Sequence, residues 1–349
     1  DPKIKKQLIS ENKKIKWEPA HIRDGRFGEW LREIKDWAIS RERYWGTPLP
    51  VWVCEKCEKK HVIGSLEDLK KKTKKSGNKY FVMRHGEAEN NAQDIYSSDQ
   101  KINHLTEKGR MQVMKTMQAL KKKKITKIYS SPFLRTRETA DLVAEQINFP
   151  KEQIIYDDRI REIEFGDFSG RPVREYWDYM KNKTWEFDKK IPGGESFQDG
   201  KNRIGDFLYE IDQKYQNKTI LIISHGLAVE MVPAVIEAAD KKRSLEIFTT
   251  QMKNKTASLH SEHEFVPLPH NTDYELDYHR PFIDEVKLVC DCGGSATRTK
   301  EVMDVWFDSG AMPFAQDHYP FSAFNGNNKT QKLLSPADFI YEGIDQTRG

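Results

Sequence analysis

The sequence predicts an α/β protein in which one domain is inserted into another. In the middle of the chain, short apolar segments at 80–83, 127–129 and 219–223 alternate with stretches of helical periodicity. Strands that alternate with amphipathic helices are typical of a mostly parallel sheet covered by helices on both faces. One close pair of cysteines precedes this region and another follows it. If the two pairs meet, the middle of the chain interrupts a single flanking domain.

Length and charge limit the possible classes of protein. The 349 residues exceed one ordinary domain, and 58 Lys plus Arg against 54 Asp plus Glu give a net charge of only +4. This balance lacks the strong basic field of a dedicated nucleic-acid binder. The longest apolar run, 219–223, is far shorter than a membrane helix, and the first residues contain no apolar signal region. We therefore expect a cytoplasmic protein outside the membrane. Because position 1 is not methionine, we also expect a piece of a longer polypeptide.

The middle domain is predicted to begin after a lysine-rich linker at 70–79. We place its limits at 78–266, with flanking segments at 1–77 and 267–349. Each predicted strand ends at a candidate site residue, which is the edge where open α/β sheets bind ligands. Apolar residues at helical spacing predict helices at Met111, Met114, Met117 and Leu120, at 140–147, and at 204–215. We interpret the methionines as core residues.

The four cysteines form two close pairs, a CxxC motif at 54–57 and a CxC motif followed by two glycines at 290–294. Zinc takes four thiolates in a tetrahedron, and a short turn places two sulfurs on one side of the ion. Glycine permits the tight turn that such ligation needs. The pairing favours a structural zinc site, with four free thiols as the alternative, because spacing alone does not bring the pairs together. The candidate ligands are Cys54, Cys57, Cys290 and Cys292.

Five side chains of the middle domain together indicate phosphoryl transfer: Arg84, His85, Arg135, Glu162 and His225. A neutral imidazole held in one tautomer can accept a phosphoryl group if nearby cations offset the charge. His85 has Arg84 beside it, and a second guanidinium from Arg135 can grip the phosphate oxygens bidentately. His225 can donate a further hydrogen bond to the same group. Glu162 is the candidate general acid for the leaving oxygen and the later base for water.

On these residues, the stretch from about Tyr80 to about Glu264 resembles the histidine phosphatase superfamily, which includes cofactor-dependent phosphoglycerate mutases and many phosphomonoesterases. The segment 84–91, RHGEAENN, is similar to the signature of that family. The resemblance implies a phosphoglycerate mutase-like three-layer α/β/α domain with His85 as nucleophile and with Arg84 and Asn91 in the phosphate pocket. It assigns the second arginine, the acid and the second histidine of the family to Arg135, Glu162 and His225. Ala88 stands where the family usually has Ser or Thr.

A glycine-rich segment, PGGES at 192–196, leaves two interpretations open. Glu195 and Ser196 either bind substrate or serve as a first-turn acid and a helix cap. Hydrolysis and phosphomutase activity also both remain open, because they differ in how the pocket admits a second phosphorylated substrate. We favour hydrolysis of a small phosphorylated substrate. A catalytically silent docking module for a partner or for tRNA is a further alternative.

The flanking segments contain three other motifs. The first is an aromatic and arginine-rich stretch at 36–52 that includes WGTP, and the others are DVWFDSGAMP at 304–313 and YEGIDQTRG at 341–349. Acidic and amide groups after a short apolar strand suit an amino group and ribose hydroxyls. Both flanks resemble the isoleucyl-tRNA synthetases of class I. The resemblance implies a zinc knuckle and a Rossmann-like segment of a domain that makes aminoacyl adenylate. It assigns the amino-acid pocket to Trp306 and the adenylate contacts to Glu342, Gly343, Asp345 and Gln346.

This second resemblance implies that ATP and isoleucine tRNA are substrates of the full-length protein. Neither the His-Ile-Gly-His nor the Lys-Met-Ser-Lys-Ser motif of the family occurs in the chain. Both motifs help to bind ATP and to stabilise the adenylation transition state. We therefore expect that this chain alone does not activate isoleucine, and that the editing domain lies outside it. An artificial fusion is a further alternative, against which stands the placement of the middle domain between the two cysteine pairs.

Overall fold

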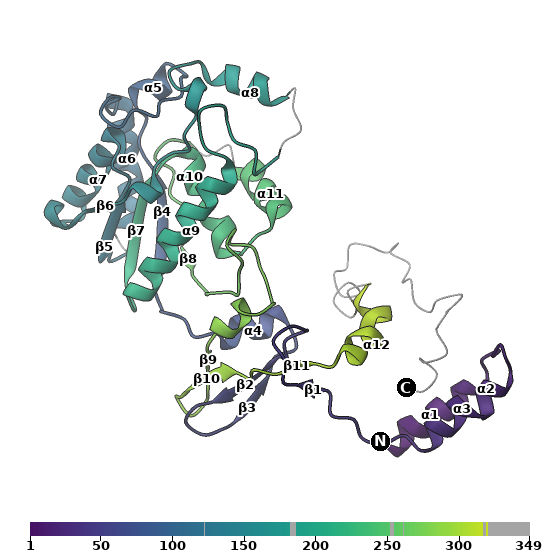
Figure 1. Cartoon of the computed structure of the whole chain (residues 1–349). Helices are drawn as coiled ribbons and strands as arrows, with labels where there is room; N and C mark the ends of the chain where they lie inside the picture. Colours follow the sequence, from purple (N-terminus) through teal and green to yellow (C-terminus); the bar gives the residue numbers. More distant parts are fainter. Residues whose placement is uncertain (122, 182–185, 252–254, 261, 317–318, 320–349) are drawn as a thin grey trace. The chain divides into compact units, whose positions relative to one another are not determined.

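The structure is a computed structural model, and it describes the chain except residues 122, 182–185, 252–254, 261, 317–318 and 320–349. The chain divides into two compact units, one formed by 50–299 and one that combines 1–49 with 300–349 (Figure 1). Among the described residues, no helix is both long and apolar enough to cross a membrane. The predicted limits at 77/78 and 266/267 both fall inside the larger unit and stay predictions.

The smaller unit joins segments from both ends of the chain. Its strands β1 (Ser40–Arg41) and β11 (Val302–Met303) pair antiparallel, with Ser40 opposite Met303. The side chain of Asp304 caps the helix that follows β11 by accepting the Trp306 N–H at 2.8 Å. Its helices are α1 (Pro2–Asn12), α2 (His21–Asp24), α3 (Arg26–Arg32) and α12 (Val305–Ala315).

In the larger unit, a four-stranded antiparallel sheet with the order β3-β2-β10-β9 unites residues before and after the middle domain. Trp52 is 1% exposed, and its indole N–H donates to the Val286 carbonyl at 2.8 Å. This bond ties the first half of the small sheet to the second. The elements are β2 (Val51–Cys54), β3 (Lys60–Val62), α4 (Leu66–Lys72), the 3-10 turn η4 (Phe282–Glu285), β9 (Leu288–Val289) and β10 (Ser295–Arg298).

The middle domain is built on a second sheet with the order β6-β5-β7-β4-β8. The first four strands run parallel, and β8 is antiparallel to β4. Its strands are β4 (Lys79–Arg84), β5 (Lys127–Ser130), β6 (Ile155–Tyr156), β7 (Thr219–Ser224) and β8 (His263–Glu264). Its helices are α5 (Glu89–Ala92), α6 (Glu107–Leu120), α7 (Leu134–Gln146), α8 (Val173–Lys181), α9 (Phe197–Lys214), α10 (Gly226–Ile236) and α11 (Lys241–Gln251), with 3-10 turns η1 (Lys151–Gln153), η2 (Asp158–Ile160) and η3 (Gly166–Phe168).

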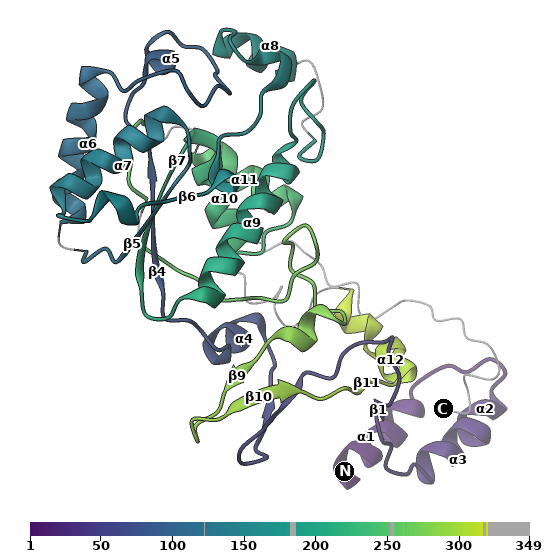
Figure 2. The ribbon, with the colours of Figure 1, turned by 60° about the vertical axis from the view of Figure 1, so that its left-hand side comes forward.

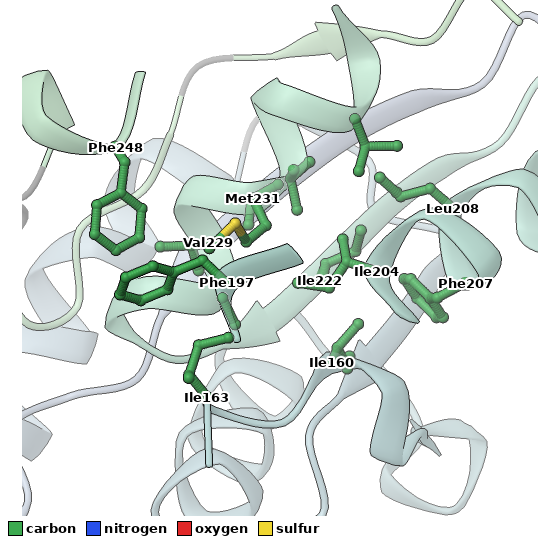
Figure 3. Close-up of a cluster of buried hydrophobic side chains, with 14 of the residues drawn as sticks. Ile160, Ile163, Phe197, Ile204, Phe207, Leu208, Ile222, Val229, Met231 and Phe248 are labelled. Carbon is green, nitrogen blue, oxygen red and sulfur yellow. The ribbon is translucent and has the colours of Figure 1, made fainter. Parts of the chain in front are cut away.

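Successive side chains of each strand point to opposite faces of the sheet, so the core of this domain forms two layers. In β7, Leu221 and Ile223 pack with α6 and α7, whereas Ile220 and Ile222 pack with α9 and α10. Figure 2 shows these two helix pairs on opposite sides of the sheet. In Figure 3, side chains from α9, β7 and α10 interdigitate around Ile222. The predicted three-layer α/β/α arrangement is therefore confirmed.

The methionine stripe of α6 is only partly buried, and the prediction that all three methionines are core residues is wrong. Met117 is 1% exposed, but Met111 is 60% and Met114 is 40% exposed. The face of α6 that meets the sheet instead contains Gly109, Val113, Met117 and Leu120. Because these four follow a spacing of three or four residues, they form one stripe and leave Met111 and Met114 beside it.

The two connections between the middle domain and the small sheet run side by side. Thr73 forms a β-bridge with Leu288, and the N–H of Lys74 donates to the Lys287 carbonyl at 2.8 Å. At the domain's own edge, Lys79 of β4 lies opposite Glu264 of β8. A domain whose ends meet can be inserted without separating the host elements on either side.

Candidate active site

The candidate site lies at the carboxyl edge of the large sheet. His85 follows β4, Ser131 follows β5 and His225 follows β7. Because these strands are parallel neighbours, their ends bring the three residues to one place. The sheet thus brings together side chains that are far apart in the sequence.

His85 is held in a single tautomer. Its side chain is 2% exposed, and its Nδ1 lies 2.6 Å from the Gly86 carbonyl oxygen. Because a carbonyl only accepts, Nδ1 carries the proton and Nε2 keeps its lone pair. Burial, together with the charges of Arg135 and Arg84, holds the pKa of His85 well below its ordinary value. The ring is therefore a neutral base whose lone pair is on Nε2.

Gly86 is required by a close approach to helix α6. A Cβ on Gly86 would lie 2.6 Å from the Gly109 carbonyl oxygen, and a Cβ on Gly109 would lie 2.0 Å from the Glu87 carbonyl oxygen. Both contacts are too short for any side chain, so the two glycines let the loop after β4 pack against α6. This packing sets the carbonyl that orients His85.

Arg135, in the first turn of α7, points its guanidinium at the same ring. Its Nε donates to His85 Nε2 at 3.3 Å, and Nη2 donates to the Ser97 carbonyl at 3.2 Å. Nη1 is buried and has no hydrogen-bond partner within the described part of the chain. Burial lowers the pKa of Arg135 to about 10, so the group stays cationic at neutral pH. It therefore presents an unused donor beside His85.

His225 lies against His85, with 5.2 Å between the ring centroids. Its Nε2 is 2.8 Å from Ser131 Oγ, and its buried Nδ1 has no partner among the residues described. Burial, followed by the charge of Arg135, keeps the pKa of His225 well below its usual value. A second unsatisfied nitrogen therefore adjoins the nucleophile candidate.

Glu162 is fixed by the start of helix α10. One carboxylate oxygen accepts the Leu227 and Ala228 N–H groups at 3.2 and 3.3 Å, and it also accepts the Ile163 N–H at 3.0 Å. Free N–H groups at a helix start favour a negative charge. The helix thus holds the carboxylate at the edge of the same pocket.

A pocket of about 310 Å³ contains most of the predicted phosphate site. Its wall includes Arg84, His85, Asn91, Arg135 and Glu162. The side-chain Oδ1 of Asn91 accepts the Ala88 N–H at 3.0 Å, which leaves the side-chain NH₂ for other contacts. The predicted set therefore converges on one cavity, with His225 directly behind it.

Glu195 and Ser196 do not line this pocket. The Glu195 carboxylate makes an ion pair with Arg161 and accepts from Arg203 at 3.1 Å. Ser196 is the N-cap of α9, where its hydroxyl accepts the Asp199 N–H at 3.0 Å and Asp199 reciprocates. The structure supports the cap for Ser196, places Glu195 in an ion-pair network, and gives no support to substrate binding by either.

The two cysteine pairs do meet. All four sulfur atoms lie within 4.8 Å of one another, with Cys54 Sγ 3.5 Å from Cys292 Sγ and Cys57 Sγ 3.7 Å from Cys290 Sγ. Hydrogen bonds from the backbone N–H groups of Cys57 and Lys56 lower the pKa of Cys54 to about 6. Four converging sulfurs, one of them in an environment that stabilises a thiolate, suit a tetrahedral zinc ion.

Two glycines allow the cysteines to converge. Gly293 has φ of +77°, a left-handed conformation that glycine adopts without strain. A Cβ on Gly294 would lie 2.9 Å from Cys54 Sγ. Glycine is therefore required after the second cysteine pair, as predicted. Gly293 is required for its left-handed backbone, and Gly294 is required because a side chain there would collide with Cys54.

The predicted adenylate residues are largely outside the described structure. Trp306 lies in the first turn of α12 and is 48% exposed. Glu342, Gly343, Asp345 and Gln346 lie outside the described residues, so no geometry tests their assignment.

Sequence reasoning missed two residues of the site. Ser131 contacts His225, and Glu230, which is 1% exposed in the second turn of α10, lines the pocket. The position of Ser131 directly after a predicted strand was an available signal. Glu230 could have been found by helical spacing, because it lies four residues after Gly226 on the same helix.

Comparison with protein families assigns the two parts of the chain separately. The sequence model of the histidine phosphatase superfamily (branch 1) matches residues 80–259, and that of the class I tRNA synthetases (I, L, M and V) matches 2–128 and 225–349. The chain belongs to both families. The two matches overlap at 80–128 and 225–259, where the structure has strands and helices of the phosphatase domain.

The synthetase part is similar to isoleucine–tRNA ligases. Identity is 24% over 346 residues with the ligase of Thermus thermophilus, covering 99% of this chain and 14% of that protein. It is 57% over 79 residues with isoleucine–tRNA ligase 2 of Bacillus cereus, and 54% over 69 residues with the ligase of Dehalococcoides mccartyi. These two alignments cover 22% and 20% of this chain and 7% of each relative. The chain thus spans a small part of the length of these ligases.

Two solved structures are similar to part of the chain. A mycobacterial glucosyl-3-phosphoglycerate phosphatase in complex with VO3 is 20% identical with a TM-score of 0.44, and the match covers 53% of this chain and 90% of that one. YhfR of Bacillus stearothermophilus is 22% identical with a TM-score of 0.44, and the match covers 58% of this chain and 98% of that one.

Proposed function

We propose that the inserted phosphatase domain hydrolyses a phosphomonoester through a phosphohistidine at His85. The observation that carries this proposal is the state of the His85 ring, which is neutral and has its Nε2 lone pair beside the Arg135 guanidinium. Two buried nitrogens nearby, Arg135 Nη1 and His225 Nδ1, lack partners among the described residues. The neutral His225 ring carries its proton on Nδ1 when the Ser131 hydroxyl donates to Nε2. A phosphate oxygen bound there would satisfy both.

The reaction divides into two displacements at phosphorus. In the first, His85 Nε2 forms the N–P bond as the P–O ester bond breaks, and Glu162 supplies the proton to the leaving oxygen. In the second, Glu162 takes a proton from water, whose oxygen attacks phosphorus, and the N–P bond breaks to release inorganic phosphate. Arg84 and Arg135 offset the charge on the transferring group in both steps.

The test is hydrolysis of an aryl phosphate by the chain and by His85→Ala, with His279→Ala as a matched control at an exposed histidine. We expect His85→Ala to lose roughly 10³-fold or more in kcat/KM, because the nucleophile is gone, and His279→Ala to retain activity. Acid-labile phosphate bound to histidine should appear in the wild type and in His279→Ala but not in His85→Ala. Equal activity in the two variants contradicts the proposal, and no activity in any of the three proteins favours the docking-module alternative.

We further propose that the synthetase segments belong to an isoleucine–tRNA ligase in the cytoplasm, with ATP, isoleucine and isoleucine tRNA as substrates of the whole enzyme. The 57% identity with a ligase over 79 residues supports this. Trp306, Glu342, Gly343, Asp345 and Gln346 are the proposed contacts to the adenylate. Isoleucine-dependent pyrophosphate exchange is the measurement: we expect none from this chain, because it contains neither signature motif that binds ATP. Exchange by the isolated chain would contradict the expectation that this chain alone does not activate isoleucine.

A further inference from the structure

Beyond the phosphate-binding end, the pocket has an acidic and aromatic wall. Asp94 and Glu230 lie on it, together with Tyr96, Phe165 and Trp177. Tyr96 and Phe165 stack with 3.7 Å between their ring centroids, and Trp177 hydrogen-bonds to Tyr96. This wall is the part of the pocket that would surround the alcohol portion of a phosphate ester.

Glu230 brings a negative charge close to the phosphate end. It projects from α10, one turn beyond the N–H groups that hold Glu162, and it is 1% exposed. Burial lowers the pKa of Arg84, and the charges of Glu162 and Glu230 act against that lowering. Arg84 is therefore flanked by two carboxylates before any phosphate binds.

The charges on the described pocket wall do not balance a phosphate dianion. Two guanidinium groups, Arg84 and Arg135, face two carboxylates, Asp94 and Glu230, while Glu162 carries the proton that it gives to the leaving oxygen. Both active-site histidines are kept neutral by burial. A dianionic phosphate therefore leaves an excess of negative charge, and a carboxylate or a second phosphate on the same molecule would raise it. A cation carried by the substrate would offset this excess.

Asn90 adds a neutral acceptor to the same wall. Its Nδ2 donates to the Ile95 carbonyl at 3.1 Å, which fixes the orientation of the amide. Its buried Oδ1 has no partner among the residues that the structure describes. An unsatisfied acceptor oxygen is complementary to an N–H donor and not to another anion.

We propose that the substrate is the phosphate monoester of an amino alcohol, whose ammonium group lies between Glu230, Asn90 and the aromatic rings. This inference rests on the proposed phosphatase function and names its substrate class. Carboxylates attract an ammonium group in a partly dry pocket, and aromatic faces bind it by cation–π attraction. The same wall disfavours phosphoglycerate and bisphosphorylated molecules, which a mutase would need to admit, and so favours hydrolysis.

The test compares ligands that differ in one group. Phosphoethanolamine and propyl phosphate have the same shape, but one ends in an ammonium and the other in a methyl group. Titration calorimetry with the His85→Ala chain measures the affinities of the two ligands in the absence of turnover. The kcat/KM of the wild type measures how well each ligand is hydrolysed. We expect roughly tenfold or greater preference for phosphoethanolamine, with 3-phosphoglycerate weaker than both.

Glu230→Gln keeps the shape of the side chain and removes its charge. We expect this variant to lose most of the preference for phosphoethanolamine, and Glu237→Gln, at the exposed end of the same helix, to keep it. Equal affinities of the two alkyl ligands, or a loss in Glu230→Gln that is the same for both, would overturn the inference. Failure of the wild type to hydrolyse any phosphate ester, aryl phosphate included, would instead overturn the proposed function and the inference with it.

Discussion

At the scale of single residues, the candidate site depends on hydrogen bonds that fix protons. The Gly86 carbonyl puts the proton of His85 on Nδ1, and Arg135 faces the opposite nitrogen. Glu162 is held by N–H groups at the start of α10. Each of these contacts assigns one chemical role to one atom, so substitutions at these positions should have separable effects.

The first prediction concerns pH. Because burial and two arginines depress the pKa of His85, the ring stays neutral as pH falls through the ordinary histidine value of 6.5. We expect kcat/KM for an aryl phosphate not to fall as the pH decreases through 6.5. Any decrease of kcat/KM in acid should have an apparent pKa below that value. A pH–rate profile corrected for ionisation of the substrate measures this. A limb centred at 6.5 would mean that His85 titrates as an exposed histidine does.

The second prediction concerns Glu162. If Glu162 protonates the leaving oxygen, Glu162→Gln should slow hydrolysis of an alkyl phosphate by roughly 10²-fold or more, because an alkoxide is a poor leaving group. Hydrolysis of nitrophenyl phosphate, whose leaving group needs little protonation, should fall less. Asp199→Asn, at the cap of α9 outside the pocket, serves as the control. Equal losses for both esters in Glu162→Gln would exclude the acid role.

At the scale of elements, two sheets position two different sets of ligating atoms. The parallel sheet gathers the loops after β4, β5 and β7, whereas the small antiparallel sheet gathers the turns that contain the cysteines. Cys54 lies opposite Ala296 in that sheet. Strand pairing therefore brings together the two cysteine motifs that the middle domain separates in the sequence.

The third prediction concerns zinc. We expect one zinc ion per chain, held by Cys54, Cys57, Cys290 and Cys292, and we expect Cys57→Ser to lose metal and to lower the melting temperature. Metal binding stabilises the folded form only, so its removal by a chelator should have the same effect. Glu55→Ser changes an exposed neighbour in the same turn and should retain zinc. Metal analysis of the three proteins decides this, and a wild-type chain purified without zinc would refute it.

At the scale of the whole molecule, the phosphatase domain joins its host through two adjacent connections. The backbone contacts between Lys74 and Lys287 and between Thr73 and Leu288 lie at that junction. After the predicted limit at 266, Tyr274 still packs in the core of the phosphatase domain, and its hydroxyl donates to Asp206 at 2.6 Å. The compact phosphatase core thus includes residues that the predicted boundary leaves out.

The fourth prediction follows from that packing. A fragment of residues 75–277 should be more stable than one of 78–266, because the shorter fragment lacks Tyr274 and the Ser76 hydroxyl that donates to Asp212 at 2.6 Å. Loss of a buried aromatic side chain typically costs about 3–5 kcal/mol. Urea unfolding of both fragments measures the difference. Equal midpoints would place the boundary at 266 and would show that 267–277 adds nothing to the fold.

The sequence by itself determined which residue types are present at which spacing, and that was enough for local and chemical conclusions. Three features depend only on neighbours in the chain. They are the parallel strands separated by helices, the RHG motif at 84–86 and the SHG motif at 224–226, and the CxxC and CxC pairs. Only the tertiary structure decided what the distant parts do to one another. The burial that keeps His85 neutral and the negative wall at Glu230 arise from contacts between segments far apart in sequence. Local pattern carries no information about such contacts, because burial and charge at a site depend on every element that packs around it.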